Sequence, residues 1–453
     1  MSYCDTKMLQ VHLASILHFL EDPAKSGEED SYRYYSDGAL VVEDGLVKQV
    51  GDSEELLSYL PQDADIFDHG KNLLVPGFID VHVHYPQMEI IASYGEHLLE
   101  WLEKYTFPAE AQFGDVSYAH EVSEQFVKEM LRVGTTSALV FGTVHPVSLD
   151  SFFEVCEKKN LRMIAGKVMM DRNAPSNLLD TAESSYADSK ALIEKWHGRG
   201  RLQYAVTPRF SVTSSPEQLE KAGQLREEYP SIYLQTHLSE SKEELSMVRK
   251  LFPGCKNYLD TYDSHGLLGP RSIFAHCIHL EEDEWSRLSA TQSSIAFCSS
   301  SNLFLGSGLF SLSSAERNAI KVGLGSDVGG GTSLSMLSNM NDAYKILRLR
   351  SEEFSPLKAF YLATLGGAEV LDLDHTIGNF EPGKEADFVV LDRSATPLIE
   401  FRLGKSENVI EDLFVFSMLG DDRVVKQTWS AGLKVHDRDI DIGIDDSVEF
   451  LGI

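Results

Sequence analysis

The feature that most constrains the fold is a repeated alternation of two kinds of segment between residue 73 and about residue 373. Short, apolar, β-branched segments alternate with longer ones in which apolar residues recur at helical spacing. The predicted strands are LLVPGFIDVHVH (73–84), TTSALVFGTVHP (135–146), LRMIAGKVMM (161–170), RLQYAVTPRF (201–210), IYLQTHLSE (232–240), SIFAHCIHL (272–280), SSIAFCSSSN (293–302) and IKVGLGSDVGGG (320–331). Eight strand–helix units over about 300 residues predict a (β/α)₈ TIM barrel.

A doubly wound open sheet is the alternative arrangement of alternating strands and helices. It is disfavoured because no G-x-G-x-x-G follows any of the predicted strands. The long connection between the first two strands contains YGEHLLEWLEKYTFPAE (94–110), whose apolar residues have helical spacing. This segment is either a helix packed on the surface or a lid over the mouth of the barrel.

The two ends of the chain predict a second, smaller unit. Segments 7–18 and 38–51 are predicted strands, the second of them a hairpin that turns at Glu43-Asp44-Gly45. Near the other end, GNFEPGKEADFVVLD (378–392) turns through two Gly/Pro pairs and enters a predicted valine-rich strand, and further predicted strands are 413–419, 424–432 and 433–437. We therefore expect a small β-sandwich domain formed by residues 1–72 plus 378–453, beside a catalytic barrel of residues 73–377.

Composition excludes several classes of partner. The net charge of −30 and the pI near 4.8 argue against binding to nucleic acid or an anionic membrane, since both would repel the protein. No signal peptide and no apolar run long enough to span a membrane is found. The five cysteines are scattered without a C-x-x-C pair, which favours a reduced, cytoplasmic protein without a cysteine zinc site.

Side chains able to bind a metal gather at the ends of the predicted strands. In the first strand, apolar and polar residues alternate, and this period of two places His82 and His84 on one face. Further polar or aromatic side chains at or just after strand ends are Gln87, Arg209, Phe210, Thr236, His237, Glu240, His276, His279, Ser326 and Asp327. Because active sites of such barrels lie at the C-terminal ends of the strands, we expect these residues to converge there.

The ligand types indicate which metal the site would select. Imidazoles with one carboxylate suit Zn²⁺ better than Fe²⁺ or Mn²⁺. A catalytic site of this kind keeps one position for water, whose pKa the metal lowers to about 7. Asp327 could accept the proton of that water, and Glu240, three residues after His237, could serve the same site without binding the metal.

Long motifs in the chain resemble a known family. PGFIDVHVH, the later TH, AH and GSD motifs, and GNFEPGKEADFVVLD resemble the amidohydrolase superfamily over nearly the whole chain. Within it, HVHYPQ (82–87), LLEWLEKYTFPAE (98–110), TPRF (207–210), THLSE (236–240) and SDVGGGTSLSM (326–336) resemble the guanine deaminase family. This resemblance implies a homodimeric, zinc-dependent enzyme of purine catabolism that converts guanine and water to xanthine and ammonia.

The resemblance also implies roles for particular residues. The expected zinc ligands are His82, His84, His237 and Asp327. The expected catalytic residues are Glu240 as proton carrier, Asp327, and His276 in contact with water or substrate. Residues expected to contact the purine are His84, Gln87, Arg209, Phe210, His237, Glu240 and Asp327.

Two alternatives remain open at this point. The first is another aminohydrolase of the same architecture, acting on a pterin, an oxidised guanine or a triazine. The second is an inactive scaffold that only assembles with partners, which is disfavoured because every expected ligand is retained. A nucleic-acid-editing deaminase is rejected, since the chain has no H-x-E followed by P-C-x-x-C.

Overall fold

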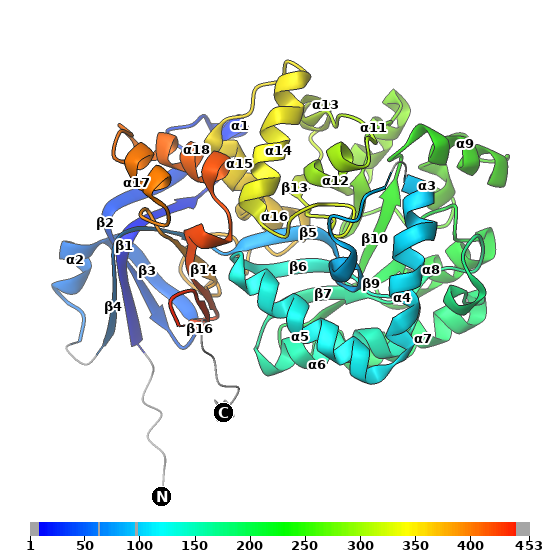
Figure 1. The fold of residues 1–453 in the computed structure, drawn as a ribbon, viewed down its shortest axis with the longest axis horizontal. Helices are drawn as coiled ribbons and strands as arrows, with labels where there is room; N and C mark the ends of the chain where they lie inside the picture. The colour runs from blue at the N-terminus through cyan, green and yellow to red at the C-terminus, as the bar shows by residue number, and fades with distance from the viewer. Residues whose placement is uncertain (1–8, 62–63, 96–97, 441–453) are drawn as a thin grey trace, which may run out of the picture.

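The computed structural model describes residues 9–61, 64–95 and 98–440, which form a parallel barrel and a separate mixed sheet (Figure 1). The barrel strands are hydrogen-bonded in the order β13-β12-β11-β10-β9-β7-β6-β5, and the short β8 pairs with β9. Their bounds are β5 Phe78–His84, β6 Thr135–Phe141, β7 Arg162–Gly166, β8 Val168–Met169, β9 Gln203–Pro208, β10 Tyr233–Leu238, β11 Ser272–His276, β12 Ser294–Phe297 and β13 Val322–Leu324. The predicted (β/α)₈ barrel is confirmed.

Helices follow the barrel strands and surround them (Figure 1). The longer of these helices are α5 Val116–Arg132, α6 Pro146–Lys158, α7 Ala182–Trp196, α8 Pro216–Glu228, α9 Lys242–Leu251, α11 Glu282–Ala290 and α14 Met336–Leu349, and α18 Val409–Leu419 lies along the chain between two strands of the mixed sheet. Several of them begin after a residue whose side chain accepts a backbone N–H, such as Asp115 before α5 and Ser215 before α8. In these helices the polar residue before the apolar run fixes where the helix starts.

Shorter helical turns complete the fold. They are α1 Pro23–Ser26, α2 Ser53–Leu57, η1 Tyr85–Ile90, α3 Leu98–Trp101, η2 Leu102–Thr106, α4 Phe107–Glu110, η3 Ala111–Gly114, η4 Ser176–Leu178, α10 Asp260–Asp263, α12 Ser299–Phe304, α13 Leu312–Arg317, α15 Pro356–Leu362, α16 Leu365–Val370, α17 Pro397–Leu403 and η5 Asp422–Val424. Among the described residues, no helix has the length and apolar character needed to cross a bilayer.

The seam of the barrel, between β5 and the segment after β13, is closed near the strand ends. The N–H of Asp327 donates to the carbonyl of His82 at 2.8 Å, and that of His84 donates to the carbonyl of Val328 at 2.9 Å. The buried Asp80 also accepts hydrogen bonds across the seam, from the N–H of Ser326 at 3.0 Å and from its hydroxyl at 2.5 Å. Burial raises the pKa of Asp80 to about 7. The closing contacts therefore lie beside two residues of the predicted metal site.

Both ends of the chain build the second sheet, as the sequence predicts. Its strands run in the order β16-β15-β14-β4-β1-β2-β3. Their bounds are β1 Leu9–Phe19, β2 Tyr32–Glu43, β3 Leu46–Asp52, β4 Asp65–Pro76, β14 Phe388–Leu391, β15 Val425–Ser430 and β16 Leu433–Asp437. β4 and β14 pair antiparallel and join the N-terminal strands to the C-terminal ones.

Two local predictions were wrong. Leu73–Pro76 belong to β4 of the mixed sheet, and the first barrel strand begins only at Phe78, because the chain changes sheet at Gly77. Residues 413–419, predicted as a strand, lie in α18, whose N-cap Asn408 accepts the N–H of Glu411. This helix packs against α14, α15 and α17. Its run of apolar residues has no period that separates a buried helix from a strand.

A network of charged side chains joins the base of the barrel to the mixed sheet. Arg162 begins β7 and pairs with Glu385, which also accepts from Arg201 at 2.6 Å. Arg201 donates further to Asp387 at 2.6 Å and to the hydroxyl of Ser430 at 2.8 Å. Burial opposes ionisation of Glu385, but the two guanidinium groups lower its pKa below the usual value. The network ties the two sheets together at the end of the barrel opposite the predicted site.

Candidate active site

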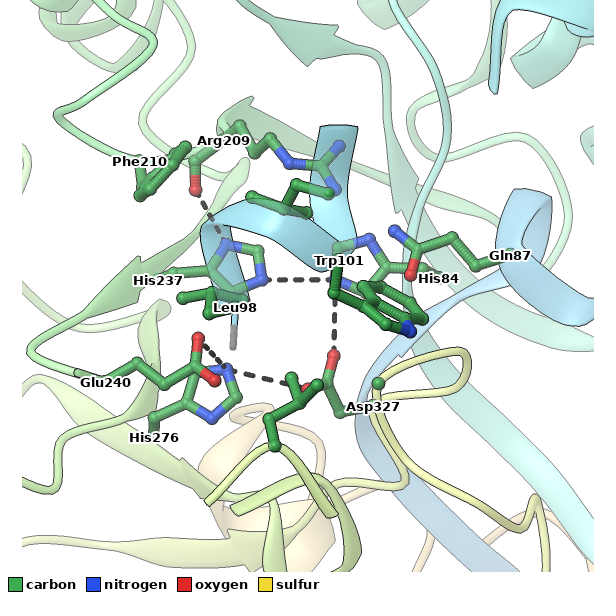
Figure 2. Close-up of a pocket in the computed structure, with 13 residues that line it drawn as sticks. His84, Gln87, Leu98, Trp101, Arg209, Phe210, His237, Glu240, His276 and Asp327 are labelled. Atoms are coloured by element: carbon green, nitrogen blue, oxygen red, sulfur yellow. Dashed lines mark hydrogen bonds and ion pairs between the residues drawn. The ribbon is translucent and has the colours of Figure 1, made fainter. Parts of the chain in front are cut away.

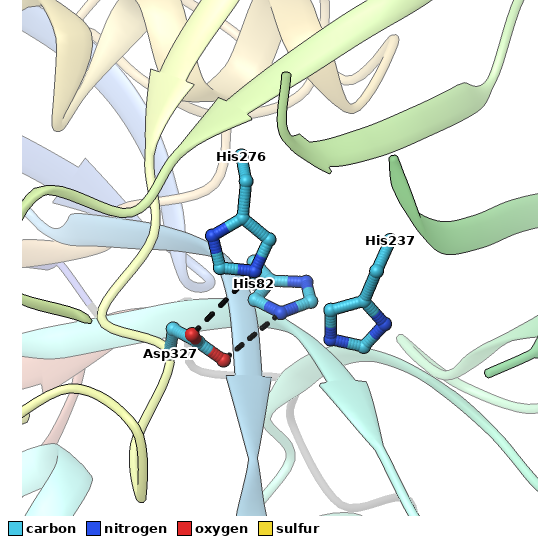
Figure 3. A group of neighbouring side chains, drawn as sticks. All are labelled: His82, His237, His276 and Asp327. Atoms are coloured by element: carbon cyan, nitrogen blue, oxygen red, sulfur yellow. Dashed lines mark hydrogen bonds and ion pairs between the residues drawn. The ribbon is translucent and has the colours of Figure 1, made fainter. Parts of the chain in front are cut away.

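The side chains of the predicted metal site come together at the mouth of the barrel (Figure 3). One potential ligand atom from each of His82, His237, His276 and Asp327 lies within 4.8 Å of the others, and all four residues are buried. His82 Nε2 is 3.1 Å from Asp327 Oδ1, and His276 Nε2 is 3.6 Å from Asp327 Oδ2. Each side chain comes from the C-terminal end of a strand or the loop directly after it.

His84 also reaches this cluster. Its Nε2 lies 3.1 Å from His237 Nε2 and 3.4 Å from Asp327 Oδ1. His84 was a predicted ligand, whereas His276 was predicted to contact water or substrate. The structure therefore brings five candidate ligands to one point, and three of them, His82, His237 and Asp327, belong to both sets.

Neighbouring groups fix the ring orientation of two of these histidines. His237 Nδ1 lies 2.7 Å from the carbonyl oxygen of Arg209, and His276 Nδ1 lies 2.9 Å from Asn302 Oδ1. The carbonyl oxygen of Arg209 can only accept, so His237 Nδ1 carries a proton and donates it. His276 Nδ1 likewise donates to Asn302 Oδ1. In the neutral form, the Nε2 lone pairs of both rings then face the cluster, which is how metal-binding imidazoles are commonly held.

Burial and charge set the protonation of the cluster. Burial lowers the pKa of His82 and His237, and that of His84 to about 3, so these rings are neutral. Burial opposes ionisation of Asp327, but hydrogen bonds from His82 and His84 hold its pKa well below the usual range. These three neutral imidazoles and the ionised carboxylate are the donor set that a divalent cation requires. Burial opposes the charged form of His276, but the nearby carboxylates of Glu240 and Asp327 raise its pKa above the usual value.

An orphaned atom supports the same fit. His276 Nε2 is buried and has no hydrogen-bond partner among the described residues, and the same holds for His84 Nδ1. A buried imidazole nitrogen without a hydrogen-bond partner is a costly arrangement unless a bound ligand completes it. We therefore take the cluster to fit a divalent metal ion.

Glu240 stands beside the cluster without joining it. Its Oε2 is 3.5 Å from His276 Nε2, and its Oε1 accepts the hydroxyl of Ser307 at 2.8 Å. Burial raises the pKa of Glu240 to about 7 against the opposing effect of His276. The N-cap of α9 is Ser241, in a capping box with Glu244, so Glu240 is not needed to start that helix.

The opposite end of the cavity carries a buried ion pair. Arg209 Nη1 donates to both oxygens of Glu110, at 2.8 and 2.9 Å, and Gln87 Nε2 donates to Glu110 Oε1 at 3.0 Å. Gln87 Oε1 accepts the N–H of Gly329 at 3.3 Å. Arg209 and Gln87 are thus fixed in orientation, while both border the same cavity as His237 and Asp327.

Apolar side chains line the walls of the cavity, which opens to solvent. Phe210 lies at one wall, and Leu98 and Trp101 come from the segment over the mouth (Figure 2). Leu102 of the same segment also lines the cavity. The segment predicted as a helix or lid is helical through α3, η2 and α4 where the structure describes it. A cavity with a few fixed polar groups and apolar walls suits a small, flat, polar ligand.

The structure separates the expected residues into two groups. His84, Gln87, Arg209, Phe210, His237, Glu240, His276 and Asp327 line the cavity, and His82 lies in the adjoining metal-binding cluster. His279 instead faces the carbonyl of Ser307, and Thr236 bonds to the carbonyl of Arg209. Glu110, Asn302 and Ser307 were missed; Glu110 stood inside a quoted motif, and only its burial among polar partners reveals its place.

Comparison with known proteins places the chain in a family. The model of the amidohydrolase family matches residues 73–435. A guanine deaminase of Escherichia coli is 54% identical over 90% of this chain and 92% of that protein. The solved structure of E. coli guanine deaminase has a TM-score of 0.93 at 52% identity, covering 95% of this chain and 100% of that one. A guanine deaminase from C. acetobutylicum, solved with guanine in its active site, has a TM-score of 0.85 at 28% identity, over 94% and 100% of the two chains. The chain therefore belongs to the amidohydrolase family and, within it, to the guanine deaminases.

Proposed function

We propose that this protein hydrolyses guanine to xanthine and ammonia. The observation that carries the proposal is one cavity that joins a metal-binding cluster to the oriented side chains of Arg209 and Gln87. The first group suits activation of water, and the second suits an amide-like purine edge. Similarity to guanine deaminases over nearly the whole chain supports the same substrate.

The metal that we propose is zinc, held by His82, His84, His237 and Asp327, with His276 beside it. Imidazoles with a carboxylate favour zinc among the divalent cations available to such a site. When bound, a zinc ion supplies Lewis acidity, which lowers the pKa of a water molecule toward about 7.

The purine is proposed to lie with its carbonyl edge at Arg209 and its amino-bearing carbon toward the cluster. The guanidinium group presents planar donors suited to the carbonyl oxygen at C6. Gln87 keeps one further N–H and one lone pair, which match the donor and acceptor of an amide edge. Phe210, buried in the wall, offers an apolar surface for the ring.

Glu240 and Asp327 are proposed to carry the protons. Water adds to C2, and its proton must leave while a ring nitrogen gains one. Glu240 is held by Ser307 and has a pKa of about 7, so it can both accept and donate at neutral pH. The proton of the new C2 hydroxyl group then passes to the amino group, which leaves as ammonia while the C2 carbonyl forms, so the reaction balances.

The decisive test follows the ultraviolet absorbance of guanine and the release of ammonia with purified, zinc-loaded protein. We expect turnover of guanine and none of adenine, whose C6 amino group would face Arg209 donor to donor. A panel with a pterin, 8-oxoguanine and a triazine separates the alternative aminohydrolases. Preferred turnover of one of these, or comparable turnover of adenine, would contradict the proposal.

The resemblance extends the proposal to assembly and location. We propose a homodimer acting in guanine catabolism in the cytoplasm. Sedimentation of the purified protein tests the dimer, and fractionation of the source cells tests the location.

A further inference from the structure

We propose that Glu110 selects neutral over anionic purines by cancelling the charge of Arg209, an inference that rests on the proposed function. Both oxygens of Glu110 accept from Arg209 Nη1 and one of them also accepts from Gln87. The Glu110 side chain is fully buried and that of Arg209 is 3% exposed. Solvent therefore screens neither charge, and the two groups act on a bound ring as one neutral pair.

The Glu110–Arg209 pair can affect ligand binding because Arg209 borders the cavity. Figure 2 shows Arg209 and Gln87 at one end of the opening, with Glu240, His276 and Asp327 at the other. Glu240 and Asp327 thus lie away from the guanidinium group, whereas Glu110 touches it. Without Glu110, a buried cation would face the carbonyl edge of the purine uncompensated, an arrangement that favours an anionic ligand.

The chemistry of the reaction gives this selection a purpose. Guanine is neutral near pH 7 and carries one ring carbonyl. Its product carries two, and the anion left by loss of a ring proton is delocalised over both, so the product is the stronger acid. A neutral ion pair can donate hydrogen bonds to the carbonyl oxygen that both rings share, but it adds no net attraction for the negative charge of the product. Glu110 thereby weakens product retention while preserving recognition of the substrate.

Glu110 also acts through the orientation of its two partners. It is the last residue of α4, and the same stretch of chain supplies Leu98 and Trp101 to the mouth of the cavity. By binding Arg209 and Gln87 together, it fixes the spacing of the donors that face the purine. Glu110 is a positioning residue, since it meets the ligand only through these two side chains.

The test compares two purines that share the carbonyl oxygen at C6. Hypoxanthine is the neutral probe, and xanthine at mildly alkaline pH is the anionic one. Dissociation constants are measured by calorimetry on zinc-loaded wild type and Glu110→Gln, whose melting temperatures and zinc contents are compared first. We expect Glu110→Gln to shift the affinity ratio toward xanthine by roughly 10- to 100-fold, the range of one charge-assisted hydrogen bond.

Glu89→Gln is the matched control. Glu89 is exposed, accepts from the amide of Gln112 and the hydroxyl of Tyr118, and lies outside the cavity. The same substitution there should leave the ratio unchanged. An equal loss of affinity for both purines in Glu110→Gln, or an unchanged ratio, would overturn the inference.

Arg209→Gln provides the reverse test if Glu110→Gln fails to fold. It leaves the Glu110 anion uncompensated, so its ratio should move toward hypoxanthine, and a ratio that stays or moves toward xanthine overturns the inference. Calorimetry needs no turnover, so these outcomes stand apart from the proposed reaction. Absence of ammonia release from guanine by wild type would instead contradict the reaction.

Discussion

Two clusters of buried charge lie at opposite ends of the barrel, and they differ in how completely they are paired. At the base, Glu385 lies between Arg162 and Arg201, and no side-chain atom of these three is buried without a partner. At the mouth, His276 Nε2 faces two carboxylates and is left without a hydrogen bond. Both clusters are built from charged or titratable groups, so composition alone does not distinguish them.

The two clusters differ in how they affect the free energy of the folded chain. In a fully paired network each charge is compensated, and removing one partner leaves an uncompensated buried charge that costs about 3–5 kcal/mol. An incompletely paired one costs free energy in isolation, and a bound ligand can recover it. His276 and Asp327 also have positive φ angles, 68° and 48°, a conformation that only a few per cent of non-glycine residues adopt.

The largest effect is expected at the mouth. His237→Ala removes a ligand common to both candidate sets, so zinc content should fall well below stoichiometric and ammonia release should drop to background. His84→Ala and His276→Ala sharpen the assignment, because only a ligand should reduce zinc content strongly. We expect zinc loss in His84→Ala and retention in His276→Ala, measured by elemental analysis. The reverse pattern would make His276 the ligand.

The next effect concerns proton transfer without metal loss. Glu240→Gln keeps the shape of the side chain but cannot ionise, so turnover of guanine should fall by about 10²- to 10⁴-fold. Zinc content and melting temperature should stay close to those of wild type. Glu243→Gln, an exposed neighbour in α9, is the control. Near-normal turnover in Glu240→Gln would leave Asp327 as the proton carrier.

At the base, the expected loss is stability rather than activity. Glu385→Ala leaves Arg162 and Arg201 partly uncompensated, which should lower the free energy of unfolding by about 3 kcal/mol. Turnover at 25 °C should remain within a few-fold of wild type. Denaturant unfolding and a steady-state assay on one preparation measure both quantities. A large loss of turnover with unchanged stability would show that the network at the base is energetically coupled to the candidate active site.

The smallest effects, those of pH on stability, should have opposite signs in the two clusters. The folded-state pKa of Glu240 is raised from 4.5 to about 7, so its contribution is fully present below pH 4.5 and lost as pH rises toward 7. The pKa of Glu385 is lowered, so its contribution is present above pH 4.5 and lost as pH falls through the folded-state value.

Melting temperatures of metal-free wild type, Glu240→Gln and Glu385→Gln across pH check these signs. The advantage of wild type over Glu385→Gln should shrink in acid, whereas its advantage over Glu240→Gln should shrink toward neutrality. Parallel curves for the two variants would remove the electrostatic distinction between the clusters.

Most of the barrel and the metal-binding side chains could be predicted from sequence for one physical reason. The period of two places His82 and His84 on one face, and parallel strands bring their C-terminal ends to one edge. His237, His276 and Asp327 follow from the same rule once the strands are located. Where local pattern and tertiary position agree, the residues alone suffice.

The remaining features depend on contacts that no local pattern encodes. Glu110 and Arg209 are 99 residues apart in the chain, and neither position has a periodicity that points to the other. The uniformly apolar run in α18 gave the wrong element, since burial on several sides erases the helical period. Gly77 marks the change from one sheet to another, but the alternation around it reads as a single strand.

The contacts that close the barrel determine when, during folding, the candidate active site can be completed. His82 and Asp327 are separated by 245 positions, and the backbone bond between them forms only when the segment after β13 reaches β5. During synthesis, a chain that has not yet released β13 from the ribosome lacks both this bond and the carboxylate. The complete set of five candidate ligands therefore comes together only when the last barrel strand is in place.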